Sequence, residues 1–176
     1  MRIPFRAVLF DWGGTLMSEE GPLDVPMGLW PEVRAIDGAK ETLAALAPDF
    51  RIGIATNATV SRRPMIEHAL ERVQLLEYVS EVFCFTELGV RKDSADFWSH
   101  VLATLRLSAS EVAMVGDSLE QDVIAPARHG IFSIWFDEGG RRSARPCGYP
   151  TVRALPEVVA LLGATGSRAG TRPGPR

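Results

Sequence analysis

The sequence predicts an α/β fold, a doubly wound parallel sheet of about five strands with helices on both faces. Two observations lead to this prediction. Short apolar runs alternate with segments of helical periodicity, and the connections between them are short. Several of the apolar runs end directly in a polar or charged residue, as strands do at the edge where open α/β sheets carry their chemistry.

Five apolar runs have the length and composition of buried parallel strands. They are residues 5–10, 51–55, 81–85, 112–115 and 131–135. Because crossovers between parallel strands are right-handed, the carboxyl ends of all these strands are expected at one edge of the sheet.

Helices are predicted between the strands. Asp37 is expected to cap a helix that carries Ala39, Leu43 and Leu46 on one face, and Ser61 is expected to cap the next helix. Further helices are predicted from about residue 94, after residue 118 and from about residue 155 to residue 162.

The chain of 176 residues is long enough for one domain, which we place at residues 1–162. Prolines at positions 22, 26 and 31 predict an ordered loop or flap over residues 17–37. Residues 138–150 form a basic loop rich in Gly, Arg and Pro. Residues 163–176 hold almost no apolar side chains, which predicts a disordered tail.

Composition excludes several functional classes. The formal net charge of −3 gives no basis for a nucleic-acid or acidic-membrane partner. Cys84 and Cys147 lie far apart, without the spacing of a disulfide framework or a zinc site. The N-terminus lacks the apolar segment of a signal peptide, and no apolar run has membrane-spanning length. We therefore expect a cytoplasmic protein that does not enter the membrane.

Polar residues follow three of the predicted strands. Asp11, Thr56 and Asp117 each come directly after or at the end of an apolar run, so we expect them to face one crevice. Asp122 lies about one helical turn further on. Such a carboxylate cluster suits a hard divalent cation, most plausibly Mg²⁺. With the positive charge of Lys92, these groups indicate a site that handles a phosphoryl group.

The same residues, in the same order, resemble the four motifs of the haloacid dehalogenase superfamily, and the match runs from Ala7 to about Trp135. The first motif, Asp-x-Asp-x-Thr after an apolar strand, corresponds to Asp11-Trp12-Gly13-Gly14-Thr15. The other three correspond to Thr56, to Lys92 and to Gly116-Asp117 with Asp122.

The resemblance implies a role for each residue. Asp11 would be the nucleophile and would form an aspartyl-phosphate, with Thr56 and Lys92 assisting at the phosphoryl group. Asn57 and Gly14 are expected to join Thr56 and Lys92 in binding the substrate. The implied Mg²⁺ ligands are Asp11, the backbone carbonyl of Gly13, Asp117 and Asp122, the last directly or through water.

One departure from the family pattern bears on catalysis. Gly13 stands where phosphatases of the family carry the aspartate that serves as general acid and base. General acid–base help is worth about 10²–10⁴ in rate, so turnover is in question although metal and phosphate binding are expected to be intact. Glu19 or Glu20 in the predicted flap would be the nearest substitute, although exposed Glu pairs in loops are usually solvated surface.

Two functions of different class remain open. The first is a Mg²⁺-dependent phosphatase-type hydrolase, slow or favouring good leaving groups, acting on a small or macromolecular phosphorylated substrate. The second is a phosphate-binding or regulatory module without turnover. Phosphonatase and dehalogenase activity are disfavoured, because both need a cap domain and residues 17–37 are too short for one. The capless type leaves the site open, and a homo-oligomer could replace the cap. Trp12 is expected either to line the pocket or to pack under the flap.

Overall fold

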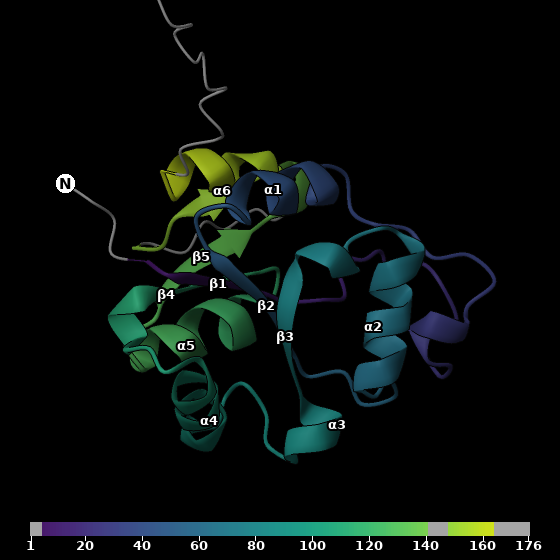
Figure 1. The fold of residues 1–176 in the computed structure, drawn as a ribbon, viewed down its shortest axis with the longest axis horizontal. Coiled ribbons are helices and arrows are strands. Elements are labelled where there is room, and N and C mark those ends of the chain that lie inside the picture. Colours follow the sequence, from purple (N-terminus) through teal and green to yellow (C-terminus); the bar gives the residue numbers. More distant parts are fainter. Residues whose placement is uncertain (1–4, 141–147, 164–176) are drawn as a thin grey trace, which may run out of the picture.

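The computed structural model describes residues 5–140 and 148–163. A single parallel sheet of six strands forms the centre of the fold, in the order β3-β2-β1-β4-β5-β6 (Figure 1). Its strands are β1 (Ala7–Phe10), β2 (Arg51–Thr56), β3 (Val79–Cys84), β4 (Val112–Gly116), β5 (Phe132–Phe136) and β6 (Thr151–Val152). The predicted fold class is confirmed, with six strands in place of about five. Strand β6 escaped prediction because it has only two residues.

Helices cover both faces of the sheet (Figure 1). They are α1 (Ala39–Leu46), α2 (Arg63–Arg72), α3 (Phe85–Leu88), α4 (Ala95–Leu105), α5 (Ala125–Arg128) and α6 (Pro156–Leu161). A π-helical turn (Leu119–Ile124) leads into α5, and short 3₁₀ turns occupy Met27–Leu29, Leu76–Tyr78, Ala109–Glu111 and Glu138–Gly140. Helix α3 is a single turn that was not predicted, and its first residue, Phe85, was expected to end the preceding strand.

The alternation of β1 divides the interior into two cores. Val8 and Phe10 pack in the larger core, which includes the buried faces of α1, α2 and α6. Ala7 and Leu9 point to the opposite face and pack in the core beneath α4. All four side chains are fully buried, as expected for a central parallel strand.

Two predicted helix caps are wrong. Helix α1 begins after Gly38, which has a φ of 80° and takes the N-cap position, so Asp37 makes no cap. Helix α2 begins after Arg62 without a side-chain cap. The hydroxyl of Ser61 accepts instead from the backbone N–H of Met27 at 3.3 Å. The serine therefore ties the loop after β2 to the 17–37 segment.

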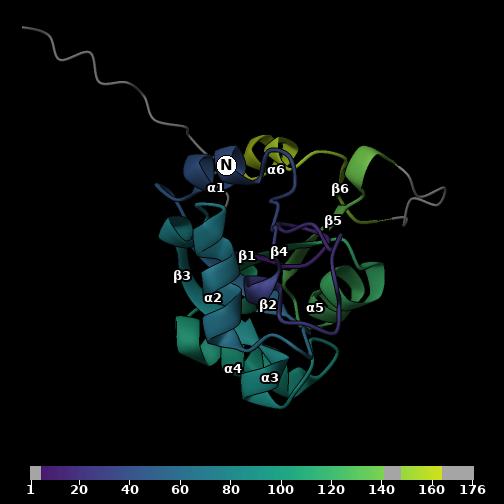
Figure 2. The same cartoon turned by 90° about the vertical axis from the view of Figure 1, so that its right-hand side faces the viewer.

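Residues 17–37 run as a long loop that crosses beside α2 (Figure 2). Met17 forms bridges with both Gly13 and Ala35, which fixes the two ends of the loop to each other. At its middle, the guanidinium of Arg72 donates to the carbonyls of Trp30 at 2.6 Å and Pro31 at 2.8 Å. The segment is thus held by backbone contacts along its length.

Some predictions fall outside the described residues or concern the membrane. Most of the basic loop (141–147), with Cys147, and the tail from residue 164 onward lie outside the part of the chain that the structure describes. Cys84 is a buried free thiol. Within the described ranges, no helix is both long and apolar enough to cross a membrane.

Candidate functional site

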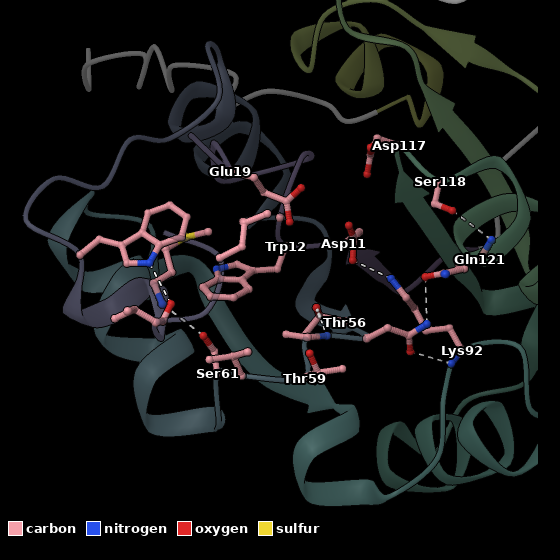
Figure 3. Close-up of a pocket in the computed structure, with 18 residues that line it drawn as sticks. Asp11, Trp12, Glu19, Thr56, Thr59, Ser61, Lys92, Asp117, Ser118 and Gln121 are labelled. Atoms are coloured by element: carbon pink, nitrogen blue, oxygen red, sulfur yellow. Dashed lines mark hydrogen bonds and ion pairs between the residues drawn. The ribbon is translucent and has the colours of Figure 1, made fainter. Parts of the chain in front are cut away.

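A cavity of about 440 Å³ opens at the carboxyl edge of the sheet (Figure 3). Asp11 follows β1, Thr56 ends β2 and Asp117 follows β4, and all three line this cavity together with Lys92. The parallel topology therefore brings together residues that are far apart in the sequence, as predicted from the strand ends.

Lys92 lies buried among the polar residues on one side of the cavity. Its ammonium donates to Asp11 Oδ1 and to Asp122 Oδ1, each at 2.6 Å, and to the carbonyl of Ala55 at 3.0 Å (Figure 3 shows the Asp11 contact). Its backbone is also fixed, because its N–H donates to Asn57 Oδ1 at 2.9 Å and its carbonyl accepts from Trp98 Nε1 at 2.6 Å. The ammonium is therefore held at one point beside Asp11.

Burial and charge shift the acidities of these groups. Loss of hydration raises the pKa of Asp11 from its ordinary value of 3.8 to about 7, and Asp122 adds to the rise while Lys92 opposes it. The pKa of Asp122 is also raised by burial. The pKa of Lys92 reaches about 12, because the two carboxylates outweigh the desolvation that opposes its charge. Lys92 thus remains a cation throughout the physiological pH range.

Asp117 is oriented by the end of the first motif. The Thr15 hydroxyl accepts from the Asp117 backbone N–H at 3.1 Å and lies 3.3 Å from Asp117 Oδ1. The Asp117 carbonyl accepts from Trp135 Nε1 at 3.0 Å. Gly14 has a φ of 75°, and a Cβ at this position would stand 3.0 Å from Asp117 Oδ2, so both the turn and the close approach require glycine here.

The carboxylates fit a divalent cation. Asp11, Asp117 and Asp122 each offer an oxygen, and these oxygens lie within 4.8 Å of one another. Lys92 pairs with Asp11 and Asp122, and the all-oxygen set of the three carboxylates suits a hard ion. The oxygens of Asp122 are already engaged, Oδ1 by Lys92 and Oδ2 by the Ser118 N–H at 2.9 Å.

The other predicted substrate-binding residues take different places. Thr56 lines the cavity, and its hydroxyl accepts from the Ala58 N–H at 3.1 Å. Asn57 also lines the cavity, but its amide joins the Lys92 backbone to Gln121 Oε1, 2.9 Å away. Gly14 is not among the residues of the cavity wall, and its N–H donates to the Met17 carbonyl at 2.8 Å. This arrangement does not support a substrate-binding role for Gly14.

The other half of the cavity is apolar, and sequence reasoning pointed only to Trp12 within it. Trp12, Met27 and Trp30 form its buried wall, while Leu23 and Val60 lie at its exposed rim. Trp12 lines the pocket and packs in the core at the same time, so the two alternatives for it are both met. Leu23, Met27 and Trp30 belong to a proline-rich loop whose apolar residues carry no periodicity, so the sequence held no signal for their part of the wall.

Glu19 also enters the cavity from the loop, and its carboxylate points toward the Asp11 and Asp117 side (Figure 3). Partial burial and the nearby charge of Asp117 raise its pKa above the ordinary value. Glu20, its neighbour, lies instead in a shallow depression with Ser18 and Arg34. The two glutamates that the sequence could not tell apart are thus separated by the fold.

Comparison with known proteins places the chain in a family. A family model described as a haloacid dehalogenase-like hydrolase matches residues 24–130, more than half of the chain. The chain belongs to the haloacid dehalogenase-like hydrolase family. The matched range of this hydrolase family includes Thr56, Lys92, Asp117 and Asp122. The Asp11 motif lies before the matched range.

Relatives of this haloacid dehalogenase-like chain include proteins named as a phosphatase and a nucleotidase. It is 37% identical over 108 residues to the ribulose-1,5-bisphosphate 5-phosphatase of Halopiger xanaduensis, covering 60% of this chain and 44% of the relative. It is 29% identical to a pyrimidine 5′-nucleotidase of Escherichia coli, covering 72% and 56% respectively. The chain thus spans about half the length of these relatives. A phosphatase of the same superfamily from Thermococcus onnurineus shares the fold, with a TM-score of 0.75, 20% identity and coverage of 93% and 100%.

Proposed function

We propose that the chain is a Mg²⁺-dependent phosphatase-type hydrolase that acts through an aspartyl-phosphate on Asp11. One observation carries the proposal. Lys92 holds Asp11 Oδ1 at 2.6 Å, while no hydrogen bond from the described residues reaches Asp11 Oδ2 at the cavity. A carboxylate fixed through one oxygen, with the other directed to an open cavity, has the geometry of a positioned nucleophile.

The reaction divides into two displacements at phosphorus. An Asp11 oxygen forms a bond to phosphorus as the bond to the leaving oxygen breaks, and the leaving oxygen takes up a proton. A water molecule then attacks the phosphorus of the aspartyl-phosphate, loses its proton to a base and releases phosphate with Asp11 restored. Lys92 and the Thr56 hydroxyl, both at the cavity wall, stabilise the negative charge of the transferring group.

Asp11, Asp117 and the backbone carbonyl of Gly13 would hold the metal, with Asp122 behind them. When bound, Mg²⁺ supplies positive charge beside the transferring phosphoryl group and reduces its repulsion from Asp11. The three carboxylates lie close enough to share one cation. Binding would also favour the ionised form of Asp11, whose pKa burial raises to about 7.

Phosphorylated compounds are the proposed substrates, and the names of the relatives point to small molecules. A macromolecular phosphate, a cytoplasmic location and a homo-oligomer that replaces a cap remain predictions. The extent of the domain, with residues 17–37 as a flap over the site, is part of the same proposal.

Hydrolysis of 4-nitrophenyl phosphate, with and without Mg²⁺, tests the proposed function. This substrate needs little protonation of its leaving group, so it reports on the nucleophile and the metal alone. We expect turnover by the wild type in Mg²⁺, and its loss in chelator and in Asp11→Asn. The alternative, a phosphate-binding module, is favoured by the absence of a side chain at Gly13. It predicts Mg²⁺ and phosphate binding with no turnover by the wild type.

A further inference from the structure

The position left empty by Gly13 is filled by another carboxylate. A Cβ built on Gly13 would overlap Glu19 Oε1 and would stand 2.8 Å from Glu19 Cδ. The end of the Glu19 side chain therefore occupies the volume into which a residue 13 side chain would project. From there the Glu19 carboxylate points toward the side of the cavity that holds Asp11 and Asp117 (Figure 3).

The backbone around Glu19 is anchored on both strands of the loop. The Met17 N–H donates to the Trp12 carbonyl at 2.9 Å, and the Gly14 N–H donates to the Met17 carbonyl at 2.8 Å. The Ser18 N–H donates to the Arg34 carbonyl at 2.9 Å, next to the bridge between Met17 and the returning strand of the loop. These bonds fix the chain immediately before Glu19, so its approach to Gly13 follows from the fold of the turn.

The charge environment argues against a merely structural carboxylate. Glu19 makes no ion pair or side-chain hydrogen bond with any residue in the described ranges, and it faces the acidic cluster instead of a cation. An exposed glutamate gains more from solvent than from a place beside other carboxylates. A carboxylate beside the acidic cluster is expected where the reaction needs a group that can gain and lose a proton next to the nucleophile.

We propose that Glu19 is the catalytic acid and base of the reaction, in the place of the aspartate that Gly13 has replaced. The inference rests on the proposed phosphatase function. In the first displacement the protonated Glu19 carboxyl gives its proton to the leaving oxygen as the bond to phosphorus breaks. In the second, the Glu19 carboxylate takes a proton from the attacking water. The proton balance then closes over one turnover.

Comparison of two aryl phosphates isolates proton donation. Phenyl phosphate and 4-nitrophenyl phosphate have similar shapes, but the phenoxide leaving group depends far more on an acid. For Glu19→Gln we expect kcat/KM to fall about 10²–10⁴-fold on phenyl phosphate, and at most about tenfold on 4-nitrophenyl phosphate. Glu20→Gln is the matched control, because Glu20 lies outside the cavity. It should behave as the wild type on both substrates.

Variants at Gly13 test the same role without relying on the Glu19→Gln substitution alone. Gly13→Ala inserts a Cβ into the Glu19 position without adding a carboxylate, and should give the same selective loss as Glu19→Gln. The double variant Gly13→Asp/Glu19→Ala supplies the carboxylate from residue 13 and should recover most of the activity on phenyl phosphate. Because Gly13 does not have a positive φ, a residue with a side chain can take this position without backbone strain.

The outcomes separate this inference from the proposed function. Suppose that the wild type hydrolyses 4-nitrophenyl phosphate through Asp11. If Glu19→Gln then lowers kcat/KM equally on both substrates, or on neither, the phosphatase function stands and the role of Glu19 is overturned. If the wild type is inert on both substrates with Mg²⁺ present, the proposed function fails and the inference fails with it. Selective loss together with rescue by the double variant establishes the role.

Discussion

Replacing Lys92 by methionine should destabilise the protein strongly. Methionine keeps most of the apolar volume but removes an ammonium that is 2% exposed and pairs with Asp11 and Asp122 at 2.6 Å each. Both carboxylates then remain buried without their cation. Removing one partner of a buried pair costs about 3–5 kcal/mol. For a chain of this size that corresponds to a fall in Tm of about 6–20 °C, at about 2–4 °C per kcal/mol.

The cost should also depend on pH. Asp11 already has a pKa of about 7 beside Lys92, and without the ammonium its carboxyl protonates more readily still. A neutral Asp11 relieves the unpaired charge at low pH, so the free energy of unfolding that is lost should be larger at pH 8 than at pH 6. Urea unfolding in the presence of chelator measures this difference, because a bound divalent cation would mask it.

Lys40 provides the matched control, since Lys40 and Lys92 are the only lysines of the sequence. The Lys40 ammonium donates to Gln74 Oε1 at the exposed surface. Lys40→Met should change the free energy of unfolding by less than about 0.5 kcal/mol. A Lys92→Met variant as stable as this control would refute the argument that the buried ammonium holds the two carboxylates.

Two further predictions concern Asp11 and Thr15. The pKa of Asp11 rises from 3.8 to about 7 on folding, so its contribution to stability is present below pH 3.8 and is lost as the pH rises through 7. In metal-free buffer, the free energy of unfolding of the wild type relative to Asp11→Asn should therefore decrease as the pH is raised from 3.8 to 7. A difference that stays constant or increases over this range contradicts the argument. Thr15→Val removes the hydroxyl that orients Asp117 and should weaken Mg²⁺ binding about 10–100-fold by calorimetry. Thr42→Val is its control, because the buried Thr42 hydroxyl finds no hydrogen-bond partner in the described part of the chain and its loss should leave Mg²⁺ affinity unchanged.

The sequence predicted the parts of the site that follow from topology. Asp11, Thr56 and Asp117 could be placed together because strand ends in a parallel sheet share one edge, and this needs only the order of strands. The buried face of α1 was predicted for a similar reason, since periodicity decides which residues of a helix face inward.

The parts that failed depend on contacts between segments distant in the sequence. Ser61 has the residue type of a helix cap, but the fold places it beside Met27, and the hydroxyl bonds to that loop instead. Asp37 fails for a local reason instead, because the adjacent Gly38 takes the N-cap position of α1. Glu19 and Glu20 have the same chemistry and adjacent positions, and only the path of the loop decides which one enters the cavity.

The same limit applies to the two aspartates of the fourth motif. From the sequence, Asp117 was expected to be a ligand, whereas Asp122 was left to act either directly or through water. In the structure, Asp122 is fully buried and its oxygens accept from Lys92 and from the Ser118 N–H. Asp122 can therefore reach a cation directly only by giving up one of these bonds, whereas Asp117 lines the cavity and is oriented there by Thr15. We therefore propose that Asp117 contacts the metal directly and that Asp122 positions Lys92 beside Asp11.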